Sequence, residues 1–513
     1  MKHIKKLASL LLVLVMVFAL ATTAFAEETT YSITINNSTA GHTYEAYQIF
    51  TGDLATNEAG NKVLSNIVWG PGVSEAGQTA LGDAAAKAET LKTEADAKAF
   101  AKAVAPYLTT AAGSANTVTD GKYVISGLAA GYYLVKDQDG SLTGDNDSYT
   151  EYIIQVVGNV TATPKSDVPE VEKKVKDTND STGVTSDWQD SADYDIGDSI
   201  PFQLKATLAD NVSSYTTYKV VFHDTLSKGL TYNNDAKVYI DGTETNRFTV
   251  TATVNADGTT TLTVSCDDVK ALGAGNSSVI TVEYTAKLNE NAVLGSAGNP
   301  NEVYLEYSNN PNKSEEGNNE TGETPKDVVI VFTYKTIINK VDSETKPLTG
   351  AAFKLEKLIK GEDGAADTWT TVKEFAVDGT TTSFTFSGLD DGQYKLTETK
   401  TPVGYNTIDP IYFVIEATHG ETADVPTLKT LNAYLTDANG NKQTEMKDGE
   451  SVNIDLGTVD LTAGSITTTV VNKSGSELPS TGGIGTTIFY VLGGVLVLAA
   501  VVLLVTKKRM GNN

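Results

Sequence analysis

Alternating side chains run through most of this chain and constrain its fold more than any other feature. In Thr249–Val254, and again over 259–264, threonine recurs between small or apolar residues. Successive side chains of a β-strand point to opposite faces, so a period of two predicts strands with one buried face. Turn residues recur between such stretches. The pattern therefore predicts a mainly β protein made of sandwich domains.

The chain has 513 residues and a single cysteine, Cys266. This length predicts about three domains, at roughly 150 residues each. An exported chain with one cysteine has no internal disulfide to stabilise such domains. Because Cys266 lies in an alternating stretch, we expect a small buried apolar residue there rather than a reactive thiol.

Composition also limits the function. The formal net charge of −26 argues against nucleic acid or anionic lipid as a partner. The sequence contains no phosphate-binding loop, no dinucleotide motif and no GxSxG. We therefore expect no cofactor, no metal and no enzyme acting on an external substrate. Metal-ligand spacing is absent among the histidines, which are His3, His42, His223 and His419.

The N-terminus has the pattern of a secretory signal peptide. Lys2, Lys5 and Lys6 precede an apolar stretch at 7–21, and a small-x-small cleavage site ends at Ala26. Such segments are removed during export, so residues 1–26 do not belong to the fold.

The C-terminal segment, 476–513, resembles a sorting signal. An apolar run at about 488–505, long enough to cross a bilayer, is followed by a basic tail that keeps its end in the cytoplasm. With the pentapeptide before it, this order resembles the LPxTG signal of sortase substrates in Gram-positive bacteria. The resemblance implies that a sortase cuts after Thr481 and joins its carbonyl to an amine. The pentapeptide is Leu478-Pro479-Ser480-Thr481-Gly482.

Between these ends we expect three domains, at 27–168, 169–333 and 334–475. The first should carry an Ala-rich helical stretch at about 79–108, inserted among its strands. The stretch at 309–326 is rich in Asn, Pro, Gly and Glu, which indicates a linker or a long loop. Strands of the first domain are expected at 31–35, 44–50, 123–135 and 152–157.

The third domain contains three strand-like stretches with reactive side chains. Lys340 lies in the first stretch, Glu398 in the second and Asn472 in the last, and each shares a strand face with an apolar residue two positions earlier. The surrounding motifs closely resemble the CnaB-type domains of Gram-positive surface proteins. The resemblance implies an immunoglobulin-like sandwich in which Lys340 bonds covalently to Asn472, with Glu398 assisting.

Burial supplies the chemistry for such a bond. A lysine amine is a nucleophile only when it is neutral, and desolvation favours the neutral form. The same desolvation favours a protonated carboxyl, which would let Glu398 hold and transfer a proton. Ammonia would leave and an amide would remain. The alternative is a buried Lys–Glu ion pair with an asparagine nearby.

The second domain resembles the fimbrial D2 or CnaA-like domains of pilins. The matching stretches are its first strand, an Asp-Thr-Leu-x-x-Gly-Leu motif and its last strand. Strand parity selects Lys173, Asp224 and Asn301 as the cross-linking set, because Lys174 would point outward. Asn309 shares the parity of Asn301 and is the rival.

The first domain lacks such a set. A weak repeat relates 126–135 to 387–396 and puts Asp137 at the place of Glu398, but the opening strand contains no lysine. We expect no cross-link in this domain.

Lys165 follows Pro164 at the end of the first domain. This ending resembles the pilin motif of sortase-built pili, although Thr163 stands where tyrosine is usual and Val156 where tryptophan is usual. The resemblance implies that Lys165 is the amine that attacks Thr481 of the next subunit. A solvated linker lysine, or a neighbour such as Lys174, is the alternative.

Taken in order, the segments resemble a backbone pilin of a sortase-assembled pilus at the cell wall. Head-to-tail joining is heterologous and does not close, so it produces a filament. The expected partners are pilin-specific and housekeeping sortases, other copies of the chain, ancillary pilins and peptidoglycan. A monomeric wall-anchored adhesin, or an ancillary pilin, is the rival function. Calcium in the Asp-rich loop at 139–147 is not supported by ligand spacing.

Overall fold

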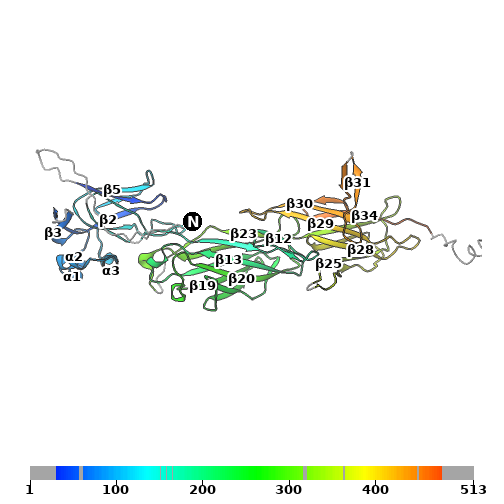
Figure 1. Ribbon diagram of the computed structural model, residues 1–513, viewed down its shortest axis with the longest axis horizontal. Coiled ribbons are helices and arrows are strands. Elements are labelled where there is room, and N and C mark those ends of the chain that lie inside the picture. The colour runs from blue at the N-terminus through cyan, green and yellow to red at the C-terminus, as the bar shows by residue number, and fades with distance from the viewer. Residues whose placement is uncertain are drawn as a thin grey trace, which may run out of the picture.

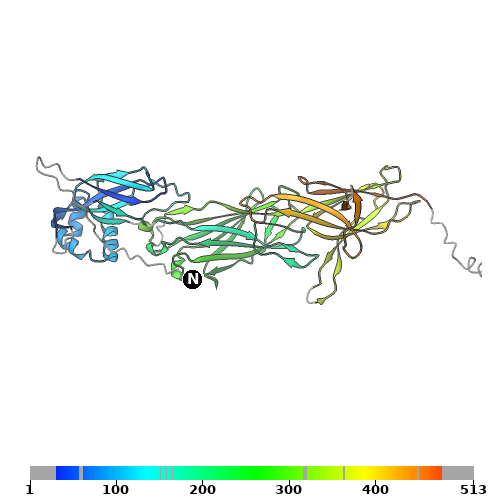
Figure 2. The ribbon, with the colours of Figure 1, turned by 45° about the horizontal axis from the view of Figure 1, so that its top comes forward.

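In the computed structural model, the described residues are 30–56, 62–150, 152–157, 159–164, 166–315, 320–361, 364–447 and 450–475. They form three β modules in a row, from the blue module to the orange one in Figure 1. Figure 2 shows the same succession from another side. The expected signal peptide, Lys165 and the sorting signal lie outside these residues. Within them, none of the helices has the length and apolar character needed to cross a membrane.

The first module packs two small sheets and a helical layer. One sheet has the order β5-β1-β8, and the other has the order β3-β2-β6-β7 with β4 paired to β2. Ile33, Tyr44 and Tyr123 belong to the core between the sheets, whereas Phe100 and Val104 bring α3 onto the other face of β2. The strands are β1 Tyr31–Asn36, β2 Tyr44–Thr56, β3 Lys62–Trp69, β4 Gly113–Ala115, β5 Lys122–Leu128, β6 Gly131–Asp137, β7 Ile153–Val157 and β8 Val160–Ala162.

The expected helical insertion is confirmed, but it begins earlier than 79 and is not continuous to 108. Three helices replace it, and each begins at a polar cap that accepts a backbone N–H: Ser74, Asp83 and Thr93. Gly82 ends the first helix at φ 86°, a conformation that glycine adopts without strain. The helices are α1 Glu75–Leu81, α2 Ala84–Thr90 and α3 Glu94–Val104, and α3 runs into the 3₁₀ turn Ala105–Tyr107.

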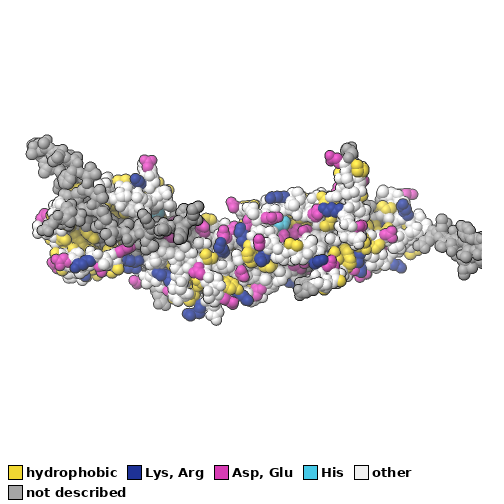
Figure 3. Space-filling view, viewed as in Figure 1, with side chains coloured by type: hydrophobic (Ala, Val, Ile, Leu, Met, Phe, Trp, Pro, Cys, Tyr) yellow, Lys and Arg dark blue, Asp and Glu magenta, His cyan; other side chains and the backbone are white. Residues whose placement is uncertain are grey.

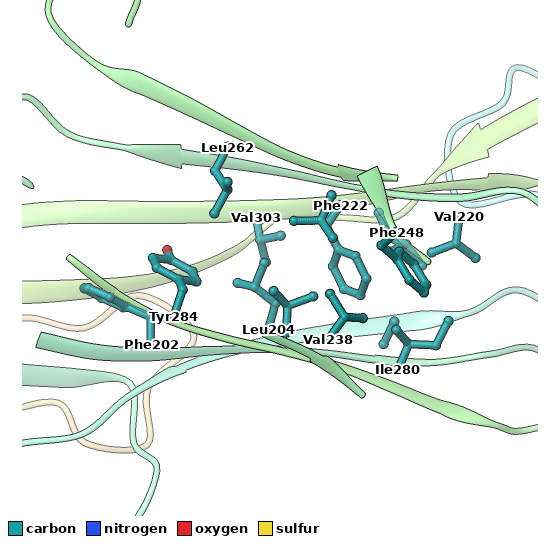
Figure 4. Close-up of a cluster of buried hydrophobic side chains, with 14 of the residues drawn as sticks. Phe202, Leu204, Val220, Phe222, Val238, Phe248, Leu262, Ile280, Tyr284 and Val303 are labelled. Carbon is teal, nitrogen blue, oxygen red and sulfur yellow. The ribbon is translucent and has the colours of Figure 1, made fainter. Parts of the chain in front are cut away.

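The second module is a sandwich of two sheets, with the orders β12-β23-β21-β14-β19-β18 and β17-β16-β20-β13-β9. Aromatic and branched side chains of both sheets meet between them, as the labelled residues of Figure 4 show. Cys266 is only half-buried and packs at the side of this core. The main strands are β9 Glu170–Val175, β12 Ser191–Asp193, β13 Ser199–Thr207, β14 Val220–Leu226, β16 Lys237–Ile240, β17 Thr243–Thr245, β18 Thr249–Val254, β19 Thr260–Cys266, β20 Val279–Leu288, β21 Asn299–Ser308 and β23 Asp327–Phe332.

Short elements complete the second module. The described part of the expected linker at 309–326 packs against the second module, because Asn309 and Pro311 are buried and β22 pairs with β21. A hairpin of β10 and β11 reaches toward the third module. These elements are β10 Thr178–Asn179, β11 Val184–Thr185, β15 Leu230–Tyr232 and β22 Thr321–Glu323, with 3₁₀ turns at Val212–Ser214, Lys270–Leu272 and Pro311–Lys313.

The third module is a second sandwich, with the sheets β27-β24-β34-β33 and β26-β25-β28-β29-β30. A hairpin of β31 and β32 projects from it (Figure 1). Its first strand β24 and last strand β34 run parallel and adjacent. The strands are β24 Tyr334–Val341, β25 Ala352–Ile359, β26 Thr368–Glu374, β27 Ser383–Leu389, β28 Gly392–Lys400, β29 Ile411–His419, β30 Leu428–Thr436, β31 Thr444–Lys447, β32 Glu450–Asn453, β33 Thr458–Asp460 and β34 Ser465–Val471.

The weak sequence repeat corresponds to a shared structural unit. The turn between β5 and β6 and the turn between β27 and β28 each carry the chain from one sheet to the facing sheet. Tyr133 and Tyr394 each donate a hydrogen bond to the carbonyl four residues earlier. In both modules the first strand also lies parallel to the last one, β1 to β8 and β24 to β34. The first and third modules therefore share a strand arrangement.

Charged side chains cover the outside of the modules. On the face shown in Figure 3, acidic and basic side chains of the described residues are interspersed along the length of the chain. Surface ion pairs such as Lys205–Glu172 and Lys313–Glu320 are exposed to water, so each contributes little to stability. The folds therefore depend on their buried cores.

Candidate functional site

Lys173 is buried between the two sheets of the second module. Its strand, β9, is the edge of one sheet and pairs with β13, where Lys173 lies opposite Leu204. Lys173 is at an inward position of β9, so its side chain points toward the facing sheet and is fully buried. Its Nζ lies 2.5 Å from Oδ1 of Asp224, which is equally buried on β14.

Tyr284 connects the members of this set. Its hydroxyl donates to Oδ2 of Asp224 at 2.5 Å and accepts hydrogen bonds from Lys173 Nζ at 3.2 Å and Asn301 Nδ2 at 2.7 Å. Figure 4 shows the Tyr284 ring between the sheets, stacked with Phe202. The side-chain oxygen of Asn301 is buried and accepts no hydrogen bond from the described residues. The structure thus brings the three predicted residues together around a fourth.

Sequence reasoning missed Tyr284. It lies on β20 at an inward position, two residues after Val282 and two before Ala286. The alternation alone could have placed it in the core, but a tyrosine there looks like ordinary core packing. Its hydroxyl reaches Asp224 because the two sheets face each other, which the sequence alone does not show.

Burial shifts the protonation equilibria of all three ionisable groups. Desolvation lowers the pKa of Lys173, although the charge of Asp224 opposes part of this shift. Desolvation likewise raises the pKa of Asp224, against the attraction of Lys173, and the pKa of Tyr284. Each shift favours the uncharged form, so together the shifts favour a neutral amine beside a protonated carboxyl.

Asn309, the rival of Asn301, lies elsewhere. Its Nδ2 donates to Oδ1 of Asp147 at 3.2 Å, and its backbone carbonyl accepts from Tyr149. Both partners belong to the first module, so Asn309 contributes to the joint between the first two modules. Asn301 is therefore the asparagine that lies in the cluster of Lys173 and Asp224. Lys174 points away from this cluster and pairs with Asp190.

In the third module, Lys340 lies on β24, and Asn472 directly follows the neighbouring strand β34. Lys340 of β24 is opposite Val470 of the parallel strand β34, and the Asn472 backbone N–H donates to the Val341 carbonyl at 3.1 Å. Both side chains are fully buried. Lys340 Nζ donates to the carbonyls of Val341 and Val470, at 3.1 Å each. Desolvation lowers the pKa of Lys340, opposed by the charge of Glu398.

Glu398 reaches Asn472 from the facing sheet. Its Oε2 accepts hydrogen bonds from Asn472 Nδ2 at 3.0 Å and from Thr401 Oγ1 at 3.1 Å. Asn472 Nδ2 also donates to the carbonyl of Asn406 at 2.8 Å. Among the described residues, the buried Glu398 Oε1 and Asn472 Oδ1 have no hydrogen-bond partner. The structure therefore places all three predicted residues of this set at one end of β24 and β34.

The first module has a different buried polar group. Oδ1 of Asp137 lies 2.8 Å from Nδ1 of His42, and its Oδ2 accepts from the Thr150 backbone. Tyr44 completes this network through the Thr150 hydroxyl at 2.9 Å. The charged partner of Asp137 is a histidine rather than a lysine, so this group lacks the amine that a cross-link would need.

The intersubunit residues stay predictions. Lys165, Thr481 and the rest of the pentapeptide lie outside the described residues. Just before Lys165, strand β8 ends at Ala162 and Thr163 is exposed.

Three domain families match this chain. Residues 196–311 match "Gram-positive pilin backbone subunit 2, Cna-B-like domain", residues 335–429 match the SpaA "Prealbumin-like fold domain", and residues 470–510 match the "LPXTG cell wall anchor motif". The second module is thus matched to a Cna-B-like family, where we expected a CnaA-like one. The match to the anchor motif includes the predicted pentapeptide and the apolar run after it.

The chain is also similar to characterised surface proteins. The trypsin-resistant surface T6 protein of Streptococcus pyogenes serotype M6 is 26% identical over 449 residues, which span 76% of this chain and 77% of that protein. The T6 backbone pilin structure, described as modular with three domains, superimposes with a TM-score of 0.56 at 19% identity over 88% of this chain and 100% of that chain. The major pilin SpaD of Corynebacterium diphtheriae gives 0.49 at 19% identity, over 87% of this chain and 98% of that chain. The likeness to the T6 structure confirms the expected tandem immunoglobulin-like fold.

Proposed function

We infer that this chain, a Gram-positive pilin backbone protein with a cell wall anchor motif, is joined head to tail into a pilus from the Thr481 carbonyl to the Lys165 amine. The domains we propose are 27–168, 169–333 and 334–475, and the separate cores of the three modules support this division. The role is structural, and the chain is a substrate of sortase rather than an enzyme that turns over. The match to the anchor motif carries the proposed joining of subunits, and the pair of buried Lys–carboxyl–Asn clusters carries the proposed cross-links within each subunit.

In the second domain, the proposed reaction joins Lys173 to Asn301. The neutral Nζ attacks the side-chain carbonyl carbon of Asn301, a C–N bond forms, and the bond to Nδ2 breaks. Asp224 takes a proton from the amine and returns one to the departing nitrogen, which leaves as ammonia. The Lys173–Asp224 distance of 2.5 Å suits this proton transfer.

Tyr284 is suited to guide this reaction. Its hydroxyl holds both Asp224 and Asn301, so it positions the amide against the amine. We predict that Tyr284→Phe slows bond formation by about 10- to 100-fold, while the finished bond still appears. Intact mass followed over time after refolding measures the rate. Tyr239→Phe, on neighbouring β16, is the control and should form the bond at the wild-type rate. Equal rates in Tyr284→Phe and the wild type would contradict the positioning role.

In the third domain, the same chemistry would join Lys340 to Asn472. Glu398 Oε2 accepts a hydrogen bond from Asn472 Nδ2, so Glu398 is placed to pass the proton that Lys340 loses to this nitrogen as it leaves as ammonia. The bond would tie the first strand of this domain to its last strand. Tight closure around these groups excludes water, which keeps the amine neutral.

Polymerisation tests the proposed function. Expressed with a pilin-polymerising sortase in a Gram-positive host, the chain should give a ladder of covalent multimers that resists boiling in detergent. Lys165→Arg should leave only the wall-anchored monomer, because a guanidinium is not nucleophilic at neutral pH. Lys176→Arg is the matched control and should keep the ladder.

Two outcomes would oppose this proposal. A persistent ladder in Lys165→Arg would assign the acceptor role to another lysine. A wild-type chain that is anchored but never polymerised would favour the rival function, a monomeric adhesin.

A further inference from the structure

One edge strand of the second module lacks the protection that sheet edges usually have. Strand β18, Thr249–Val254, ends its sheet and pairs only with β19 among the described residues. All six of its residues are exposed, and none is charged or a proline. Natural edge strands usually carry charges or proline, because their unpaired N–H and C=O groups can bind another strand. The edges of the facing sheet do carry charges, with Glu172 and Lys174 on β9 and Glu244 on β17.

The side chains of β18 extend the apolar core face beyond the edge of the sandwich. Val250 lies opposite Val264 of β19, and directly opposite residues share a sheet face. Ala252 lies opposite Leu262 in the same way. Both partners on β19 are fully buried, whereas Val250 is 38% exposed and Val254 is 74% exposed. The strand therefore has an unpaired hydrogen-bonding edge and an uncovered apolar face.

The sequence of β18 is complementary to itself in an antiparallel pair. With Ala252 of two copies opposite each other, Val250 of each copy faces Val254 of the other. In the same register, Thr251 of each copy faces Thr253 of the other. Packed apolar pairs and Thr–Thr pairs stabilise neighbouring strands. Valine thus meets valine, threonine meets threonine, and the small alanine lies on the two-fold axis.

Charges just outside the strand match in this register. Arg247 precedes β18 and Asp257 follows it, at equal distances along the chain from Ala252, so each arginine lies toward the aspartate of the other copy. Both side chains are exposed, and hydrogen bonds from Thr259 fix Asp257 in its turn. Opposite charges at both ends favour this register over shifted ones. The uncharged strand between them also gives two chains of net charge −26 a place to approach each other.

We propose that two copies of this chain associate side by side through antiparallel pairing of their β18 edges. The contact is isologous, because both partners use the same strand. Hydrogen bonds across the axis would join the two sheets into one continuous sheet. Because β18 has only six residues, a single pair is a small contact of weak affinity.

The direction of β18 determines how the two chains are arranged. In the same sheet, β21 begins near the joint with the third module, where the Ser296 backbone N–H donates to the Thr462 carbonyl, and ends at Asn309, in the joint with the first module. The strands of this sheet therefore run along the chain (Figure 1). Antiparallel pairing then sets the two chains in opposite directions. In pili joined head to tail as proposed above, the contact would recur between shafts of opposite direction, so that weak contacts add up.

Sedimentation of the purified, unpolymerised full chain tests the pairing. We expect the wild type to show a monomer–dimer equilibrium at concentrations between about 1 μM and 1 mM. Ala252→Lys places like charges opposite each other on the axis, so the dissociation constant should rise by about tenfold or more. Thr243→Lys adds the same charge to β17, another exposed edge strand, and should associate as the wild type does.

Cysteine cross-linking in a Cys266→Ser background tests the register. Opposite residues of antiparallel strands have Cα atoms about 4.5 or 5.5 Å apart, which suits a disulfide. Ala252→Cys should therefore give a disulfide-linked dimer under mild oxidation. Val254→Cys is the control and should give little dimer, because its counterpart in the other copy lies about 13 Å away along the strand.

Three results would overturn the proposal. They are a wild type that stays monomeric up to about 1 mM, equal association by Ala252→Lys and the wild type, and equal cross-linking by Val254→Cys and Ala252→Cys. Weaker association of Thr243→Lys would also oppose it, since any added charge would then act alike. These positions are exposed, so the unfolding midpoints should not change, which checks folding. The measurements need no sortase, and Ala252→Lys should keep the covalent ladder, so this proposal and the polymerisation proposal fail separately.

Discussion

Asp224→Ala is expected to leave the second module without its covalent bond. The mass of the purified variant should then exceed that of the bonded form by one ammonia, after correction for the substitution. Unfolding should also become easier, because a closed loop of this size removes about 4 to 5 kcal/mol of unfolded-state entropy. Lys173 would in addition lose its buried partner, which costs about 3 to 5 kcal/mol. Intact mass and thermal unfolding measure the two effects.

A second variant separates these effects. Lys173→Met removes the amine and its charge together while it keeps an unbranched side chain of similar length. It should lack the bond, but Asp224 keeps its hydrogen bond from Tyr284 and burial raises its pKa, so it can become neutral. The unfolding midpoint should therefore lie between those of Asp224→Ala and the wild type. Glu302→Ala changes an outward residue of β21 and should keep the bond. An Asp224→Ala chain that still lacks the ammonia mass would contradict the assigned role.

Glu398→Ala is expected to remove the bond of the third module alone. Asn472 Nδ2 would lose its carboxylate partner, so no group could protonate the departing nitrogen. After correction for the substitution, the mass should exceed that of the bonded form by one ammonia, while the bond in the second module remains because the two clusters lie in separate cores. The loop between Lys340 and Asn472 again predicts a loss of about 4 to 5 kcal/mol in the free energy of unfolding. Mass analysis of proteolytic fragments identifies which bond is missing.

The control for this variant is another glutamate of the same sheet. Glu356 pairs with Lys354 and Lys395, away from the Asn472 cluster. Glu356→Ala should keep both bonds. A bond between Lys340 and Asn472 in the Glu398→Ala chain, or its loss in Glu356→Ala, would show that Glu398 is not the assisting group.

Sequence patterns predicted strands better than helices here. The alternation over 259–264 coincides with most of β19, because a period of two persists wherever one strand face is buried. The helical stretch at 79–108 was predicted from composition, and alanine-rich composition does not locate the ends of helices. The caps at Asp83 and Thr93, which divide it, depend on local hydrogen bonds.

For the candidate site, strand parity was informative. It assigned inward positions to Lys173 and Asn301 without knowledge of which strands pair. Tyr284 was missed because its role depends on the distance between two sheets.

The parallel pairing of β24 and β34 determines how the third module would respond to stretching. The chain enters β24 at Tyr334 and leaves β34 after Val471, so a pull on the two ends slides these parallel strands past each other. Sliding loads all of their hydrogen bonds together, unlike peeling, which breaks them one at a time. With the proposed amide between Lys340 and Asn472, force would pass along β24 and through that bond. The rest of the module, from Val341 to Val471, would carry none of the load.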